Sequence, residues 1–268
     1  NFDPVIDLMK NAIAVGMPHS VGHDFFEDIE ARFINIQRIA CPTGLGPIDK
    51  KDILNGGLGR GEMGVVTANT GVGKSHFLVH VGCEALKLGK NVLHYTFELT
   101  ETSVGIRYDS NLCSIPSSDV RERKENVLNF YKNEDSLGRL IIKEYPTGAA
   151  TINTIRNHLE KLELKSFVPS LIIIDYADIM RSTQRYDTMR HELKFIYEEI
   201  RNLAMDMNIP IWTASQANRD SANSDIVGLE NMSEAYGKAM VADVVISISR
   251  KAAEKSTGAG RLFIAKNR

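Results

Sequence analysis

One segment constrains the fold more than any other part of this sequence. The apolar run GVVTAN passes through a turn of small residues, TGVG, into an amphipathic stretch, KSHFLVHVGCEAL. This pattern predicts a strand, a tight turn and a helix that ends near Gly89. Similar apolar runs predict strands at residues 91–97, 139–145, 170–176, 209–215, 241–249 and 261–267, with helices from about residue 100, from Ser117 or Ser118, from Thr151 and over residues 188–208.

The alternation of strands and helices indicates an α/β fold. Parallel strands joined by crossover helices form a mostly parallel, twisted sheet that helices cover on both faces. Residues 1–40 differ, because they hold two amphipathic helical stretches and are followed by the turn-rich CPTGLGPID. We therefore expect a small N-terminal helical arm at residues 1–40 and one α/β domain at residues 41–268. Since the chain begins at Asn1 rather than methionine, we also expect a further domain upstream.

Composition narrows the class of protein. The 268 residues are 43% hydrophobic and carry a formal net charge of −2, so any contact with nucleic acid must come from a local patch or from backbone amides. The cysteines Cys41, Cys83 and Cys113 lie far apart, which fits a reducing cytoplasm better than a disulfide framework or a zinc site. No apolar run approaches the roughly 20 residues of a membrane helix, so we expect no membrane partner.

The stretch ANTGVGKS resembles the phosphate-binding pattern G-x-x-x-x-G-K-[ST], with Ala68 in place of the first glycine. Gly71 and Gly73 would let the backbone wrap phosphates, Lys74 would reach the β- and γ-phosphates, and the Ser75 hydroxyl would coordinate Mg²⁺. The alternative is a fortuitous glycine-rich turn. The predicted nucleotide-binding residues are Ala68, Asn69, Thr70, Gly71, Val72, Gly73, Lys74, Ser75 and His76, although His76 also fits a packing or surface role.

Three polar residues end other predicted strands at the same edge of the sheet. Asp175 follows the run LIII and is the candidate carboxylate for the metal, while Glu98 is the candidate base for the attacking water. Gln216 ends a further strand and could contact the γ-phosphate. Each also has a plainer interpretation: a turn cap for Asp175, a favourable charge near a helix start for Glu98, and a polar strand end for Gln216.

Taken together, ANTGVGKS, FEL, IIIDY, ASQANR and AKNR resemble the RecA-type ATPase domain of DnaB-class hexameric replicative DNA helicases. The likeness covers about residues 41–268, and the stretch from residue 137 to residue 176 is similar in particular to the replicative helicases of T-even-type bacteriophages. The resemblance implies a RecA-like P-loop NTPase that uses ATP and Mg²⁺. It implies catalytic roles for Lys74, Glu98 and Gln216, metal binding by Ser75 and Asp175, base packing by Arg250, and action of Lys266 and Arg268 on the nucleotide of a neighbouring subunit. Arg250 could equally be a solvated strand end.

The resemblance also implies partners. It implies a ring of identical subunits, six being expected, around single-stranded DNA, with a primase and a helicase loader as further partners. Two loops would contact the DNA, but the second also carries Asp220, Asp225, Glu230 and Glu234, which departs from a plainly basic loop. The predicted DNA-binding residues are Arg181, Arg185, Arg190, Arg219, Ser233 and Lys238.

The expected function is therefore an ATP-driven DNA helicase motor, with 5′ to 3′ polarity implied by the resemblance alone. A ring- or filament-forming RecA- or clock-type ATPase that does not unwind DNA is one alternative. A regulatory or loader module switched by ATP is another, and it would need Lys74 but not Glu98. A small-molecule kinase is disfavoured, because no arginine-rich lid is evident.

Overall fold

The computed structural model describes residues 24–27, 29–33, 38–184, 186–217, 236–251, 254 and 257–268. The chain divides into two units, Asn1–Arg38 and Ile39–Arg268. The described part of the first unit holds a turn at residues 25–27 and the short helix α2 (Ile29–Phe33). The first of the two helical stretches predicted for the arm lies outside the described residues.

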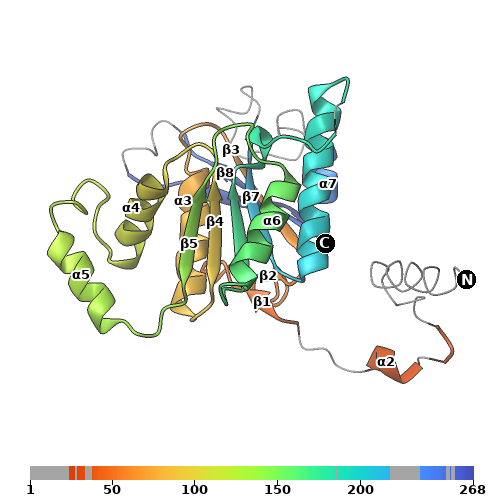
Figure 1. The fold of residues 1–268 in the computed structure, drawn as a ribbon, viewed down its shortest axis with the longest axis horizontal. Coiled ribbons are helices and arrows are strands. Elements are labelled where there is room, and N and C mark those ends of the chain that lie inside the picture. The colour runs from red at the N-terminus through yellow and green to blue at the C-terminus, as the bar shows by residue number, and fades with distance from the viewer. Residues whose placement is uncertain are drawn as a thin grey trace, which may run out of the picture. The chain divides into compact units, whose positions relative to one another are not determined.

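A seven-stranded sheet forms the centre of the second unit (Figure 1). The strand order is β5-β4-β6-β7-β3-β8-β9, and every neighbouring pair is parallel except β8–β9. The prediction of a mostly parallel sheet is thus confirmed. The strands are β3 (Met63–Ala68), β4 (Val92–Thr96), β5 (Leu140–Glu144), β6 (Leu171–Asp175), β7 (Ile211–Gln216), β8 (Val244–Ser249) and β9 (Arg261–Asn267), beside a small antiparallel pair, β1 (Ala40–Cys41) and β2 (Leu58–Gly59).

Most of the helices begin where capping residues predict. The Thr100 side chain accepts a hydrogen bond from the Ser103 amide, and Thr151 and Thr154 form a reciprocal capping box. The helices are α3 (Lys74–Lys87), α4 (Glu101–Leu112), α5 (Lys124–Asn133), α6 (Ile152–Glu163), α7 (Met189–Met207) and α8 (Tyr236–Val241), with a 3₁₀ turn η1 (Ala177–Ile179). Among the described residues, none of these helices combines the length and the apolarity that a bilayer crossing requires.

The predicted start of one helix was wrong. We expected a helix from Ser117 or Ser118, but α5 begins only at Lys124. The two serine hydroxyls donate to Ser110 Oγ and to Asp119 Oδ1 instead of capping a helix, and the Asp119 amide closes a turn onto the Pro116 carbonyl. Local side-chain bonds of this kind compete with helix formation.

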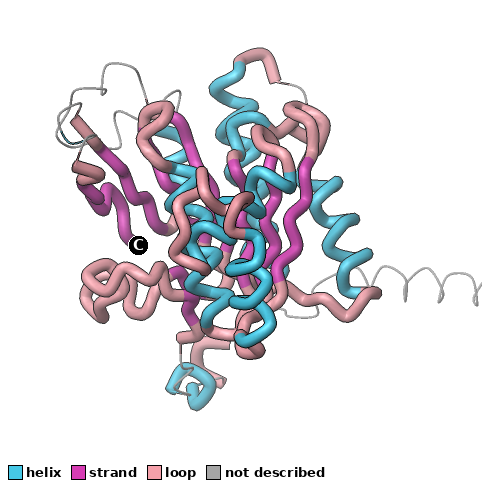
Figure 2. Tube along the Cα trace, turned by 90° about the vertical axis from the view of Figure 1, so that its left-hand side faces the viewer, coloured by secondary structure: helices cyan, strands magenta, loops and turns pink. Residues whose placement is uncertain are grey.

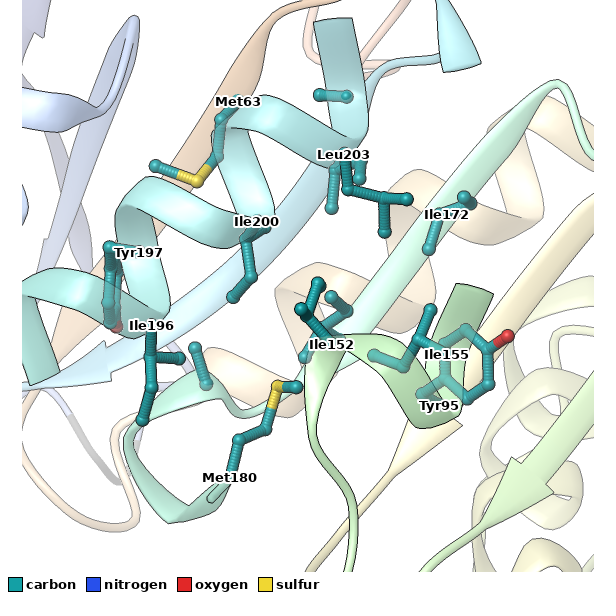
Figure 3. Packing of buried hydrophobic residues seen from close by; sticks show 14 of the residues in the cluster. Met63, Tyr95, Ile152, Ile155, Ile172, Met180, Ile196, Tyr197, Ile200 and Leu203 are labelled. Atoms are coloured by element: carbon teal, nitrogen blue, oxygen red, sulfur yellow. The ribbon is translucent and has the colours of Figure 1, made fainter. Parts of the chain in front are cut away.

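Hydrophobic cores lie on both faces of the sheet. Along β6, Ile172 and Ile174 belong to a cluster that includes residues of α6 and α7, whereas Leu171 and Ile173 belong to a cluster with α3 and α4. This alternation explains why β6 is apolar throughout, since both faces of the strand are covered. Figure 3 shows the first cluster, and Figure 2 shows loops at both ends of the strands, where polar side chains can gather.

Candidate functional site

The predicted phosphate-binding turn connects the end of β3 to the start of α3. Gly71 and Gly73 have φ angles of 73° and 127°, in the region that favours glycine, and a Cβ on either would meet nothing within 4 Å. Glycine is therefore required here by backbone conformation rather than by crowding. Ala68 has no positive φ angle and lies fully buried at the end of β3, so a side chain is tolerated where the usual pattern has glycine.

A cavity of about 370 Å³ opens above this turn. Its walls come from the ends of β3, β4, β6 and β7 and from α4, because the carboxyl ends of parallel strands meet at one edge of the sheet. The structure thus brings most of the predicted site residues together. The lining residues are Thr70, Gly71, Gly73, Lys74, Ser75, His76, Glu98, Leu99, Arg107, Asp175, Tyr176 and Gln216.

The charges in this cavity are partly desolvated. Burial lowers the pKa of Lys74, while the charges of Asp175 and Glu98 oppose that change. The Lys74 ammonium donates to the Ala68 carbonyl oxygen, with Nζ and O 3.1 Å apart. This bond holds the lysine within the turn, where its charge faces the space that phosphates would occupy.

Asp175 and Ser75 provide the oxygen ligands that a magnesium ion prefers. Burial raises the pKa of Asp175 and the nearby Glu98 charge adds to this, while a hydrogen bond with Ser75 lowers it. In the part of the chain that the structure describes, no group of three or more His, Cys, Asp or Glu side chains forms a metal cage. The residues present fit Mg²⁺, which is usually held by one or two carboxylates together with waters and substrate phosphates.

Gln216 reaches from the end of β7 to the phosphate-binding turn. Its Nε2 donates to Thr70 Oγ1 across 2.8 Å, and its main-chain N–H donates to Asp178 Oδ2 across 3.2 Å. The side-chain amide therefore stands at the edge of the cavity and already contacts the turn. An amide in this place can contact a terminal phosphate.

A second cavity of about 350 Å³ lies beside the same turn. Arg250, which follows β8, borders it and donates from Nη2 to the Gly71 carbonyl oxygen across 3.2 Å. His76 lines both cavities, and burial lowers its pKa, so its ring is neutral near pH 7. The arrangement places Arg250 and the apolar Phe77 and Leu262 where a planar base could pack.

Lys266 and Arg268 lie at the end of the strands that is opposite the phosphate-binding turn, where β8 begins. Because β9 runs antiparallel to β8, Asn267 pairs with Val244 at the start of β8. The P-loop edge lies at the other end of that strand, about 17 Å away at roughly 3.3 Å per residue. Lys266 Nζ instead donates to the Ala239 and Met240 carbonyl oxygens, at 3.0 and 2.8 Å. The structure therefore does not bring these two residues to the cavity of the same chain.

Comparison with known proteins agrees with this geometry. The family model for the DnaB-like helicase C terminal domain matches residues 41–268. The chain belongs to this family. It is 32% identical over 254 residues to a DnaB-like replicative helicase of Enterobacteria phage T4, covering 90% of the chain and 53% of that relative. It is 24% identical over 221 residues to the replicative DNA helicase DnaB of Helicobacter pylori strain 26695, covering 81% of the chain and 45% of that relative.

Solved structures show the same fold. One of them, described as an ATPase domain, superposes with a TM-score of 0.75 at 14% identity, over 92% of each chain. A DnaB-like replicative helicase, described with its interactions with primase, gives a TM-score of 0.75 at 14% identity over 97% of this chain and 66% of the other. The chain spans about half the length of the curated relatives it matches.

The predicted DNA-binding residues of this DnaB-like domain have different outcomes. Arg181, which follows η1, and Arg190, in the first turn of α7, are exposed. Arg185, Arg219 and Ser233 lie outside the described residues. For Lys238 the prediction needs correction. Its side chain is only 1% exposed and its ammonium lies 2.7 Å from Asp178 Oδ1, so it is not free to bind a DNA phosphate.

Arg107 and Tyr176 also line the cavity, although neither was predicted from the sequence. Arg107, on α4, lines the cavity and is oriented by a helix whose Val104 and Tyr108 are buried. The sequence offered one signal for Arg107: it lies next to the apolar stripe of the helix predicted from about residue 100, which directly follows Glu98. Tyr176 lines the cavity as well, and its place directly after Asp175 could have identified it.

Proposed function

We propose that this chain is an ATP-hydrolysing motor that moves single-stranded DNA through a ring of identical subunits. The observation that carries the proposal is the single cavity that gathers the P-loop, Glu98, Asp175 and Gln216. A P-loop alone would serve any nucleotide-binding protein. A carboxylate, a metal-binding pair and an amide around the same phosphate site together support hydrolysis.

In this mechanism each residue acts on a different part of the nucleotide. The free N–H groups at the start of α3 and the Lys74 ammonium bind the phosphate oxygens. Ser75 and Asp175 would hold a magnesium ion, which would supply positive charge beside the phosphates. Glu98 orients the attacking water and accepts its proton, and Gln216 contacts the γ-phosphate. Arg250 packs on the base from the adjoining cavity.

The remaining roles require a neighbouring subunit. Lys266 and Arg268 lie too far from their own P-loop to act there, so we assign them to the nucleotide of the next subunit in the ring. A hexamer and 5′ to 3′ movement are proposed from the family. DNA would contact Arg181 and Arg190, and also Arg185, Arg219 and Ser233, which the structure does not describe.

A related helicase is described with its interactions with primase, and we propose a primase and a helicase loader as partners here. We also propose that the protein works in the cytoplasm, in that of a bacterial host if a phage encodes it. There ATP and replicating DNA are both present.

Two substitutions test the proposal. Lys74→Ala should abolish ATP binding, because the phosphates lose their only lysine within the turn. Glu98→Gln should keep ATP binding and reduce hydrolysis on the order of 10²-fold or more, as expected for a positioned base. ATP affinity and hydrolysis would be measured with and without single-stranded DNA, beside light scattering for the mass of the assembly.

The same experiment separates the motor from an ATP-switched module. A motor hydrolyses ATP faster when DNA is added and depends on Glu98. If hydrolysis is slow, indifferent to DNA and unchanged in Glu98→Gln, the chain is a switch and the proposal fails. Equal ATP affinity in wild type and Lys74→Ala would contradict the assignment of this cavity as the nucleotide site.

A further inference from the structure

One buried carboxylate joins three elements beside the nucleotide cavity. Asp178, in η1, accepts hydrogen bonds through Oδ1 from Lys238 Nζ and from the Tyr197 hydroxyl, both at 2.7 Å. Its Oδ2 accepts from Ser215 Oγ at 3.3 Å and from the Gln216 main-chain N–H at 3.2 Å. The carboxylate therefore binds α7, α8 and the last two residues of β7 at once.

This cluster is almost closed to water. The side chain of Lys238 is 1% exposed and that of Asp178 is 12% exposed, while Tyr197 is fully buried. Lys238 Nζ also lies 5.4 Å from the centre of the Tyr197 ring. Burial raises the pKa of Tyr197 above its usual range, so the phenol stays protonated and donates. The Tyr197 hydroxyl also lies 3.1 Å from the Ala214 carbonyl oxygen, so it connects Asp178 to the main chain of β7 as well.

A buried ion pair is in general weak evidence for a contribution to stability. Desolvation of two charges offsets most of their attraction, and apolar residues of similar volume are often as stable. Removing one partner alone is costly, because the other charge is left buried. The pair is better explained by the position that it imposes on the groups it binds.

The neighbouring strands are polar at the same level. Thr67 of β3 stands in register with Ser215 of β7 on one side and with Ser247 of β8 on the other. The hydroxyls of Thr67 and Ser247 are buried and have no hydrogen-bond partner among the described residues, and Lys238 Nζ lies 3.5 Å from Ser215 Oγ. A polar layer therefore runs across β3, β7 and β8, and the ends of β3 and β7 reach the nucleotide cavity.

Gln216 connects this layer to the cavity. Its side chain donates to Thr70 in the phosphate-binding turn, while its main-chain N–H is held by Asp178. A shift of the Gln216 main chain away from Asp178 would stretch or release this bond. Since the same carboxylate holds Lys238, the change reaches α8 through one intervening group.

We infer that Asp178 is a positioning residue, which orients Gln216 toward the nucleotide and, through Lys238, couples that orientation to the placement of α8. The inference rests on the proposed function for the role of Gln216 but assigns a residue that does not touch the nucleotide. Asp178 holds the main chain at Gln216 and so sets the direction in which the side-chain amide reaches the cavity. The placement of α8 changes when that direction changes.

The experiment compares four variants of the 268-residue chain. Asp178→Asn keeps the shape and removes the charge, Lys238→Met removes the ammonium and keeps the stem, and the double variant removes both charges. Asp206→Asn, which breaks the exposed pair of Asp206 with Arg156, is the matched control. Each is measured for ATP affinity, kcat, thermal unfolding and amide hydrogen exchange.

Stability and positioning should separate in the double variant. Lys238→Met should unfold at a lower temperature, because it leaves a buried charge unpaired, and the double variant should recover most of that loss. Its kcat should nevertheless stay about 10-fold below wild type, with ATP affinity within about 3-fold, because the neutral amide holds the Gln216 N–H more weakly. The control should match wild type in every measurement. A double variant with wild-type kcat would overturn the inference.

Hydrogen exchange tests the coupling without hydrolysis. In the absence of nucleotide, Asp178→Asn should speed exchange at residues 215–217 and at residues 237–241 together, and added Mg–ATP should slow both segments in wild type but not in the double variant. Faster exchange in α8 alone would show that Asp178 is merely structural. If wild type does not hydrolyse ATP, the proposed motor fails, yet the paired exchange still decides the coupling.

Discussion

Gln216 and Thr70 are joined by a direct side-chain hydrogen bond of 2.8 Å between Nε2 and Oγ1. The bond connects the end of β7 to the phosphate-binding turn that follows β3, two strands that lie side by side in the sheet. The side-chain amide of Gln216, the candidate γ-phosphate contact, therefore bonds to the turn. A phosphate that accepts the same N–H would compete with Thr70 for it.

Removing that competition should strengthen ATP binding. Thr70→Val keeps the volume of the side chain and removes the accepting oxygen. A net hydrogen bond contributes about 0.5–1.5 kcal/mol, so we expect ATP to bind about 2- to 10-fold more tightly. Thr70→Ser, which retains the hydroxyl, should bind ATP as wild type does. Titration with a fluorescent ATP analogue would measure this, and weaker binding by Thr70→Val beside normal Thr70→Ser would show that the hydroxyl itself serves the nucleotide.

The edge of the sheet where this bond lies could be predicted from sequence, because local signals carried it. Glu98, Asp175 and Gln216 each end an apolar run, and parallel strands end at the same edge. The order in which the strands lie beside one another carries no such signal. β3 lies between β7 and β8, which are far from it in sequence, and this pairing follows from packing of the whole domain.

Lys238 shows why part of the candidate site could not be predicted. A lysine in a polar stretch suggests a phosphate contact, and its partner Asp178 is 60 residues earlier in the chain. Nothing local in the sequence indicates that these two charges meet in the interior. Arg107 was missed for a different reason, since a helix pattern gives the buried stripe but not which neighbouring side chain faces a cavity.

Acid should destabilise the domain through His94. This histidine is fully buried on β4, with Nδ1 3.0 Å from the Tyr108 hydroxyl, and burial lowers its pKa to about 3 from 6.5. The unfolded chain therefore binds a proton that the folded chain does not. The stabilising effect is complete above about pH 6.5 and is lost as the pH falls, by up to roughly 1.4 kcal/mol per pH unit.

His94→Gln should remove this dependence, because glutamine does not titrate. Between about pH 6.5 and pH 5, we expect the free energy of unfolding in urea to fall less in the variant than in wild type. The two slopes should differ by up to about 1.4 kcal/mol per pH unit, which corresponds to the uptake of one proton on unfolding. The variant will be less stable than wild type at neutral pH, so the slope is compared and not the absolute value. Equal slopes would mean that His94 is protonated inside the fold.

The arm should contribute to assembly rather than to the nucleotide site. In α2 and the turn before it, Phe26 and Phe33 are 76% and 79% exposed within the described structure, and apolar side chains at helical spacing favour burial against another surface. A deletion of residues 1–38 leaves β1 intact, including the bond from the Arg60 amide to the Ile39 carbonyl. We expect a smaller assembly by light scattering with ATP affinity within about 3-fold. An unchanged assembly would place the arm against its own domain.

Arg268 should act on the nucleotide of the neighbouring subunit. Its guanidinium lies 3.6 Å from Asp243 Oδ1 at the edge of the sheet opposite the P-loop, and its side chain is 56% exposed. It is therefore held in place and still accessible to another chain. An arginine that stabilises transition-state charge in this way contributes about 10³- to 10⁵-fold to turnover. Arg268→Ala should bind ATP normally and hydrolyse it more slowly by that order, while Arg156→Ala, at a surface arginine on α6, should hydrolyse ATP as wild type does.

Mixing two inactive variants tests whether Arg268 acts on the nucleotide of a neighbouring subunit. In rings assembled from equal amounts of Arg268→Ala and Glu98→Gln, an interface has both groups intact when Glu98 comes from the first variant and Arg268 from the second. Random filling gives each with a chance of one half, so about one interface in four should be active. Hydrolysis should recover on mixing, in proportion to the extent of subunit exchange. Exchange would be measured by light scattering, with the two variants fused to proteins of different mass. If exchange is complete and hydrolysis stays at the level of the separate variants, Arg268 does not act across the interface, and the guanidinium serves only to hold Asp243 and the end of β9.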